Sequence, residues 1–216
     1  MWPPVYAHHH SSRCRPPTKP LAPLQWTYEM RREMQEILPG LYLGPYSSAS
    51  RNQLERLQQT GITHIVCVRR SVEAHLIRPN FPNQFQYLEV ELAESPELWV
   101  LSHVPRVTAF LDDALCSGGR VLVHGNLGVS LSAALIVAYV MRRLSLNLSA
   151  ASGVVTARRD CVRLSPDLVR QLHEYEPICR AEKAFLAGHG SSGRCRAKRT
   201  CDQLDDEPEP MDMTSA

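Results

Sequence analysis

The sequence predicts an α/β fold with a mostly parallel central sheet. Strand-like apolar runs alternate with helix-like segments through the middle of the 216 residues, and such alternation favours parallel strands flanked by helices. One of these strands, residues 120–123, leads through a glycine-containing loop into a long apolar helix. Ligand sites in parallel sheets lie at the carboxyl ends of strands, so this loop is the first candidate site.

The first predicted elements follow from turn and helix-end signals. Residues 37–43 contain a central Pro-Gly pair and predict two short strands joined by a turn. Leu54 and Leu57 mark a short helix that ends at Gly61. Residues 62–68 then form a continuous apolar run, as in a buried strand.

The next elements lead to the candidate loop. Residues 85–92 alternate polar and apolar side chains and predict another strand. Residues 98–115 predict a helix, with Pro105 near a turn or the helix start. Residues 132–144 are apolar on nearly every face, which predicts a central helix buried beside the sheet.

Two helices are predicted beyond the central one. Residues 149–159 form the first. Ser165, Pro166 and Asp167 supply a cap, a proline at the first helical position and an acid in the first turn of a last helix, which continues through Glu176. One side of this helix is predicted to carry Leu168, Leu172 and Tyr175.

The loop after residues 120–123 has the pattern of a phosphate cradle. A strand, a glycine-containing loop and a helix start direct backbone N–H groups around a bound oxyanion. A glycine turn of this kind is common in α/β proteins, so the loop alone is a weak signal. The predicted cradle is His124, Gly125, Asn126, Leu127, Gly128, Val129, Ser130, Leu131 and Ser132.

This stretch resembles the loop of protein tyrosine and dual-specificity phosphatases, which reads His-Cys-x-x-Gly-x-x-Arg-Ser/Thr. His124, Gly128 and the serines 130 and 132 fit that pattern, whereas Gly125 stands at the cysteine position and Leu131 at the arginine position. The chain as a whole is similar to dual-specificity-type pseudophosphatases over residues 26–182. The family most similar is that of the serine/threonine/tyrosine-interacting protein, which also has glycine at the nucleophile position.

The resemblance implies a dual-specificity phosphatase-like fold and the loss of two catalytic groups. Phosphate-ester hydrolysis through a covalent intermediate needs an activated nucleophile such as a low-pKa thiolate, and Gly125 has no side chain. The nearest titratable group is His124, which we expect to order the loop through hydrogen bonds. No base is predicted in place to activate a water molecule.

Leu131 is expected to weaken phosphate binding itself. An arginine fork gives two charge-assisted hydrogen bonds to phosphate, worth roughly 1.5–3 kcal/mol each. A helix dipole and loop amides contribute roughly 0.3–2 kcal/mol for a terminal charge. The sequence therefore predicts a cradle that is a poor phosphate site as well as an inactive one.

Glu94 takes the place where the resemblance implies an aspartate general acid. Its additional methylene would misplace the proton donor, since proton transfer needs hydrogen-bond reach of the leaving oxygen. The alternative, favoured here, is an ordinary solvated carboxylate beside Pro96.

Composition favours one small intracellular domain with polar ends. The 44% hydrophobic fraction suffices for one core, and the formal net charge of +2 calls for neither nucleic acid nor a membrane surface as partner. The seven cysteines are scattered and odd in number, which indicates reduced thiols in the cytoplasm or nucleus, with Cys67 as a buried small hydrophobe. Neither a signal peptide nor a membrane span is predicted.

The predicted domain spans residues 26–187. Residues 1–25 are proline-rich and predict a disordered leader, in which His8 to His10 form a polar tract more readily than a metal site. Residues 188–216 predict a disordered tail, basic and then acidic. Its basic cluster, residues 194–199, is either a nuclear-import signal or, the reading we favour, part of a solvated polyampholyte.

Three functions remain open at this point. The first is a catalytically inactive binding or scaffold protein that sequesters phosphorylated proteins or protein kinases, MAP kinases being implied by the resemblance, or competes with active phosphatases. The second is a weak phosphatase with a nucleophile from elsewhere, and the third a divergent copy with little function. No cofactor and no metal are expected in any of the three.

Overall fold

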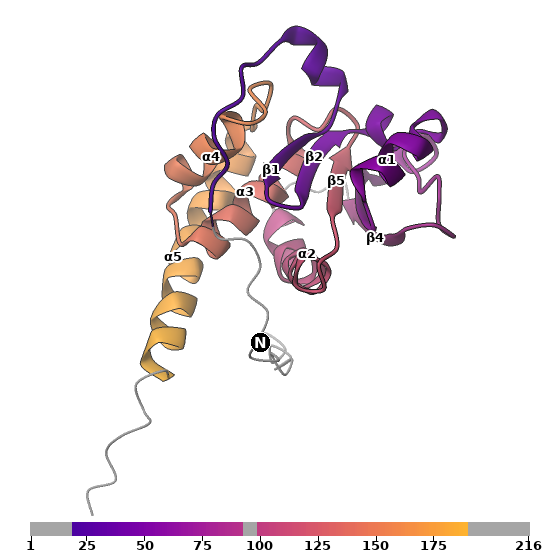
Figure 1. Cartoon of the computed structure of the whole chain (residues 1–216). Helices are drawn as coiled ribbons and strands as arrows, with labels where there is room; N and C mark the ends of the chain where they lie inside the picture. The colour runs from indigo at the N-terminus through magenta and orange to yellow at the C-terminus, as the bar shows by residue number, and fades with distance from the viewer. Residues whose placement is uncertain (1–18, 93–98, 190–216) are drawn as a thin grey trace, which may run out of the picture.

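A five-stranded sheet forms the centre of the protein, as the computed structural model of residues 19–92 and 99–189 shows (Figure 1). The strand order is β1-β2-β5-β3-β4. The first pair is antiparallel and the other three pairs are parallel, which confirms the predicted mostly parallel sheet. The strands are β1 Gln35–Leu38, β2 Leu41–Pro45, β3 His64–Arg70, β4 Gln86–Leu92 and β5 Val121–Gly125.

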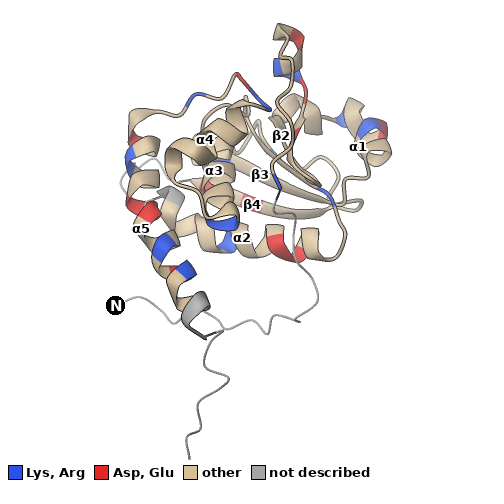
Figure 2. Cartoon of the chain, turned by 60° about the vertical axis from the view of Figure 1, so that its left-hand side comes forward, with Lys and Arg blue, Asp and Glu red and all other residues tan. Residues whose placement is uncertain are grey.

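Helices cover both faces of the sheet. Short 3-10 helices, η1 to η4, add turns before β1 and between the later strands. The helices are η1 Tyr28–Arg32, η2 Tyr46–Ala49, η3 Arg51–Gln53, α1 Leu54–Thr60, η4 Ser71–Glu73, α2 Trp99–Cys116, α3 Leu131–Leu144, α4 Leu148–Thr156 and α5 Pro166–His189. Figures 1 and 2 show α1 on one side of the sheet and α2 to α5 on the other.

The two hydrophobic clusters follow from the period of two along each strand. On β5, Val121 and Val123 join the large core beneath α2 to α5, whereas Leu122 between them joins the smaller core beneath α1. Helix α3 lies in the large core, and all ten residues from Ser132 to Met141 are buried. The central position of α3 confirms the sequence prediction and fixes the start of this helix directly behind the cradle.

The turn and cap signals produce the expected local structures. Gly40 has φ +80° in the β1–β2 turn, and Gly61 has φ +75° at the end of α1, where residues with a Cβ are strained. The Ser165 hydroxyl accepts a hydrogen bond from the Leu168 backbone N–H at the start of α5. Charged side chains follow α5 (Figure 2), where exposed pairs such as Arg170 with Asp167 add little stability.

Two predicted elements differ from the structure. Pro105 lies well inside α2, not near a turn or the helix start. Pro105 is exposed, so the carbonyl four residues earlier, which the proline leaves without a helix donor, can face water. The buried neighbours Val104 and Val107 hold the helix against the sheet. Helix α4 ends at Thr156 and not at Arg159. The chain continues from there as a turn, in which the backbone N–H groups of Arg158 and Arg159 both donate to the Val155 carbonyl.

The residues before η1 run against the helical layer (Figure 1). The Leu24 N–H donates to the Ala157 carbonyl, and Arg158 donates to the Ala22 carbonyl. The domain boundary at residue 26 stays a prediction. In the described part of the chain, no single helix is long and apolar enough to cross a membrane, and only the pair α3 and α4, bent by 117°, meets that test by length and composition.

Candidate functional site: the loop between β5 and α3

The loop after β5 has its carbonyl groups turned outward. Five consecutive carbonyl oxygens, those of residues 126–130, accept hydrogen bonds from groups outside the loop. The donors are the Tyr46 N–H to Asn126 at 3.0 Å, Arg159 to Leu127 at 3.0 Å and to Gly128 at 2.9 Å, the Arg163 N–H to Val129 at 2.8 Å, and the Ala134 N–H to Ser130 at 2.8 Å.

This arrangement leaves the loop amides free for a ligand. In a trans peptide the N–H group points opposite to the preceding carbonyl, so outward carbonyls place the following N–H groups on the inner side of the loop. Within the described residues, the N–H groups of residues 127–130 have no acceptor. Together with the start of α3, these amides have the arrangement expected of the cradle, and oxyanion binding there stays a prediction.

Arg159 holds this loop in place, and no motif in the sequence indicates this role. The side chain is completely buried and donates only to neutral oxygens. Besides the two loop carbonyls, it reaches the carbonyls of Glu33 at 2.8 Å and Arg31 at 3.1 Å and the side-chain oxygen of Gln35. Burial lowers the pKa of the guanidinium, and nearby Arg31 adds to this shift.

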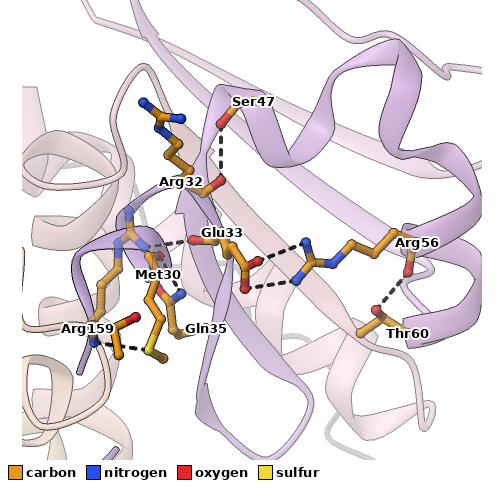
Figure 3. Close-up of polar contacts among 9 residues, drawn as sticks. Met30, Arg32, Glu33, Gln35, Ser47, Arg56, Thr60 and Arg159 are labelled. Carbon is orange, nitrogen blue, oxygen red and sulfur yellow. Dashed lines mark hydrogen bonds and ion pairs between the residues drawn. The ribbon is translucent and has the colours of Figure 1, made fainter. Parts of the chain in front are cut away.

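Arg159 thereby joins the cradle loop to the segment that leads into β1. Figure 3 shows Arg159 beside Glu33 and Gln35 of that segment. The same segment is fixed from the other side, because the Glu33 carboxylate pairs with Arg56 of α1 at 3.0 Å. The Ser47 hydroxyl also donates to the Arg32 carbonyl at 3.3 Å. The cradle is therefore one part of a network that runs from Arg159, just after α4, to Arg56 in α1.

Gly128 lets the loop pass close to β2. It has φ +64°, and a Cβ added there would lie 2.3 Å from the Gly44 carbonyl oxygen. No side chain fits in such a contact, and a non-glycine residue would also be strained at this φ. The second glycine of the predicted motif is thus required by the backbone.

Gly125, by contrast, leaves room for a side chain. It ends β5 opposite Pro45, and a Cβ added there would lie 3.1 Å from the Ser132 hydroxyl oxygen and 3.4 Å from the Val68 carbonyl oxygen. The nearer contact is the end of a side chain that can rotate. The glycine at this position is therefore not demanded by packing, and the site would admit a cysteine.

Leu131 places an apolar side chain in the first turn of α3. It is partly buried and packs against the large core. It also lines a depression of about 200 Å³ inside the loop. The other lining residues are Val68, Arg70, Glu73, Gly125, Asn126, Leu127, Gly128, Val129, Ser130 and Ser132.

Glu73 brings a negative charge to this depression. One oxygen of its carboxylate accepts a hydrogen bond from the Asn126 side-chain amide at 3.0 Å, and the other from the Arg70 backbone N–H at 3.0 Å. Both Arg70, at the end of β3, and Glu73, in η4, line the depression. The cradle wall therefore carries one charge of each sign.

His124 does not order the loop through hydrogen bonds, contrary to our expectation. Its ring is 1% exposed, and neither ring nitrogen has a hydrogen-bond partner in the described residues. The ring lies beside Tyr46, with 5.8 Å between the centroids. Burial lowers the pKa of His124 to about 4 and outweighs the opposing effect of the Gly125 backbone.

The low pKa of His124 makes the stability depend on pH. The folded state keeps the ring neutral, whereas the unfolded chain binds a proton below about pH 6.5. We expect full stability above that pH and a loss of about 2 kcal/mol by about pH 5, continuing until the folded pKa of about 4. Urea unfolding of the wild type and of His124→Phe, above about pH 6.5 and at about pH 5, measures this loss. An equal loss of unfolding free energy in the two proteins would contradict the assignment to His124.

The structure brings most of the predicted site together. Residues 124–132 form one strand end, loop and helix start, as predicted. Glu94, the predicted counterpart of the general acid, lies outside the described residues. Arg159 and Glu73 were missed, because each reaches the loop from a distant segment and neither lies in a motif that signals such a contact.

Two further observations bear on metals and cysteines. No group of three or more His, Cys, Asp or Glu side chains in residues 19–92 and 99–189 could hold a metal ion. Cys67 is buried in β3, as predicted, and burial raises the pKa of its thiol to about 12. This thiol is therefore not a nucleophile at neutral pH.

Residues 41–178 match the family model described as the catalytic domain of dual-specificity phosphatases. Similar proteins include the serine/threonine/tyrosine-interacting protein of Mus musculus and of Homo sapiens, each 43% identical over 194 residues, with 84% of this chain and 86% of the relative covered. Serine/threonine/tyrosine-interacting protein B of Xenopus laevis is 42% identical over 200 residues, with 87% of each chain covered.

Solved structures give the same relationship. The crystal structure of human tyrosine phosphatase-like serine/threonine/tyrosine-interacting protein matches with a TM-score of 0.66 and 48% identity, over 68% of this chain and 97% of that chain. A mouse putative dual-specificity phosphatase, crystallised in complex with zinc tungstate, matches with a TM-score of 0.62 and 25% identity, over 74% of this chain and 96% of that chain.

Proposed function

Because the chain belongs to the dual-specificity phosphatase family, we propose that it is a catalytically inactive member, a pseudophosphatase that acts as a binding or scaffold protein. One observation carries the proposal. The loop is fully built, with its carbonyls held outward and its amides free, yet Gly125 and Leu131 offer no nucleophile and no cationic clamp. Such a site retains the shape for recognition without the groups for turnover.

The partners that fit this proposal are phosphorylated proteins or protein kinases. The relatives carry the name serine/threonine/tyrosine-interacting protein. By analogy, this chain would sequester such partners, MAP kinases among them, or compete with active phosphatases for them. A cytoplasmic or nuclear site of action suits these partners.

The proposal is tested by separating capture from turnover. The purified full chain is incubated with aryl phosphates and with phosphopeptides, and released phosphate is measured beside an active dual-specificity phosphatase. We expect no turnover above the uncatalysed rate and stable association with a kinase or phosphoprotein partner. Hydrolysis that is lost when one residue of the chain is changed would overturn the proposal.

Restoring the two missing groups should restore activity in a defined order. Gly125→Cys alone has room for its Cβ but leaves phosphate without a clamp, so we expect little turnover. Gly125→Cys with Leu131→Arg should be about a hundredfold faster, since two charge-assisted hydrogen bonds act on the transferring group. We expect Glu94→Asp to add to this. Steady-state hydrolysis of an aryl phosphate is the measurement, and equal rates for the single and double variants would show that the arginine position matters less than argued.

A further inference from the structure

Glu73 lines the wall of the cradle, although it belongs to a segment outside the phosphatase-like motif. It belongs to η4, which directly follows β3, and its two carboxylate oxygens are held by two different donors. One donor is the Asn126 side chain, in the loop itself, and the other is the backbone N–H of Arg70. The carboxylate is therefore fixed against the cradle and not merely near it.

We propose that Glu73 acts as an internal anion that makes the cradle reject phosphate and other oxyanions, and so determines which ligands the loop accepts. This inference rests on the proposed function, because it specifies the partner chemistry of the same site. It also differs from the effect of Leu131, which removes an attraction, whereas Glu73 adds a repulsion.

The charges around the depression support this role. A phosphate or tungstate dianion in the depression would lie beside the Glu73 carboxylate, where like charges repel strongly at short range. The neighbouring cation Arg69 does not compensate, since it is paired with Glu89 at 2.8 Å and with Glu91 at 3.1 Å. Arg70 is the one cation that lines the depression in the described part of the chain, and the negative charge of Glu73 offsets its positive charge.

The ligands that remain are uncharged acceptors. The free amides of residues 127–130 still need acceptor oxygens, and the side chain of Leu131 adds an apolar wall. An unphosphorylated hydroxyl or amide of a partner protein supplies an acceptor without a negative charge. In a kinase or phosphoprotein partner of the kind proposed above, the cradle would thus contact unphosphorylated groups and not the phosphate itself.

The test is a tungstate titration of the full chain, followed by thermal shift and by calorimetry. Glu73→Gln removes the charge and keeps one acceptor oxygen, which can serve one of the two present donors, Asn126 or Arg70. We expect it to bind tungstate about tenfold more tightly than the wild type. Glu91→Gln is the matched control, because it removes one negative charge from the adjoining strand end, at a residue that pairs with Arg69 and does not line the cradle.

A second background keeps the test decisive where the wild type binds tungstate too weakly to measure. Leu131→Arg supplies a clamp, and Glu73→Gln added to it should again tighten binding about tenfold. Equal tungstate affinities with and without Glu73→Gln in both backgrounds would overturn the inference, as would an equal gain from Glu91→Gln. Turnover by the wild type, in contrast, would overturn the proposed function and leave the Glu73 result to stand by itself.

Discussion

Arg159→Met is expected to lower the free energy of unfolding by about 4 kcal/mol, a large part of the stability of a domain of this size. Methionine can occupy the space of the buried stem but donates no hydrogen bond. The carbonyls of Leu127 and Gly128 in the loop, and of Arg31 and Glu33 before β1, would then be left without the donor they have now. Urea denaturation followed by circular dichroism measures the loss.

The control for Arg159→Met is Arg170→Met on α5. The Arg170 side chain is 62% exposed and makes only a surface pair with Asp167, so we expect a change below about 0.5 kcal/mol. Arg159→Lys should also be strongly destabilised, because a single ammonium cannot reach five oxygens spread over two segments. Wild-type stability in either Arg159 variant would show that the buried hydrogen bonds are not what holds the loop.

Gly128→Ala is the second substitution with a large expected effect, again about 4 kcal/mol of destabilisation. The added Cβ would lie 2.3 Å from the Gly44 carbonyl oxygen, and φ +64° is unfavourable for alanine. Backbone strain and overpacking each cost about 1–3 kcal/mol. The loop can escape the clash only by moving away from β2, so tungstate binding in the Leu131→Arg background should be lost as well.

Gly153→Ala is the matched control for Gly128→Ala. Gly153 lies inside α4, is exposed, and has nothing within 4 Å of an added Cβ. Alanine there should raise the free energy of unfolding by about 0.5–1 kcal/mol, because it favours the helix. Thermal unfolding of both variants gives opposite signs if the two glycines have the roles assigned here, and a destabilised Gly153→Ala would contradict them.

Local patterns were enough to predict most of the fold. The hairpin around Gly40, the helix end at Gly61 and the cap at Ser165 are each decided by a few neighbouring residues, and the structure confirms all three. The apolar run after the cradle predicted the buried helix α3 for the same reason. Pro105 was placed wrongly, because a local rule that excludes proline from helices is outweighed by the packing of α2 on the sheet.

The sequence predicted where the candidate site lies, but not which distant side chains hold its loop in place. Residues 124–132 form the expected strand end, loop and helix start. The hydrogen bonds to the loop that were expected of His124 are made by Arg159 instead. Arg159 is 31 residues from Gly128 and Glu73 is 53 residues from Asn126. Contacts at such separations depend on how the elements pack, and no local pattern encodes them.

The sequence by itself determined the family-like motif, the order of strands and helices, and the absence of a thiol and a guanidinium at positions 125 and 131, because these depend on residue identity and short-range periodicity. Only the tertiary structure decided that the loop keeps its amides free, that Arg159 holds it and that Glu73 charges its wall. Each of these requires groups from separate segments to meet within hydrogen-bond distance, at 2.9 Å for Arg159 with Gly128 and at 3.0 Å for Glu73 with Asn126, and that proximity is a property of the packed fold.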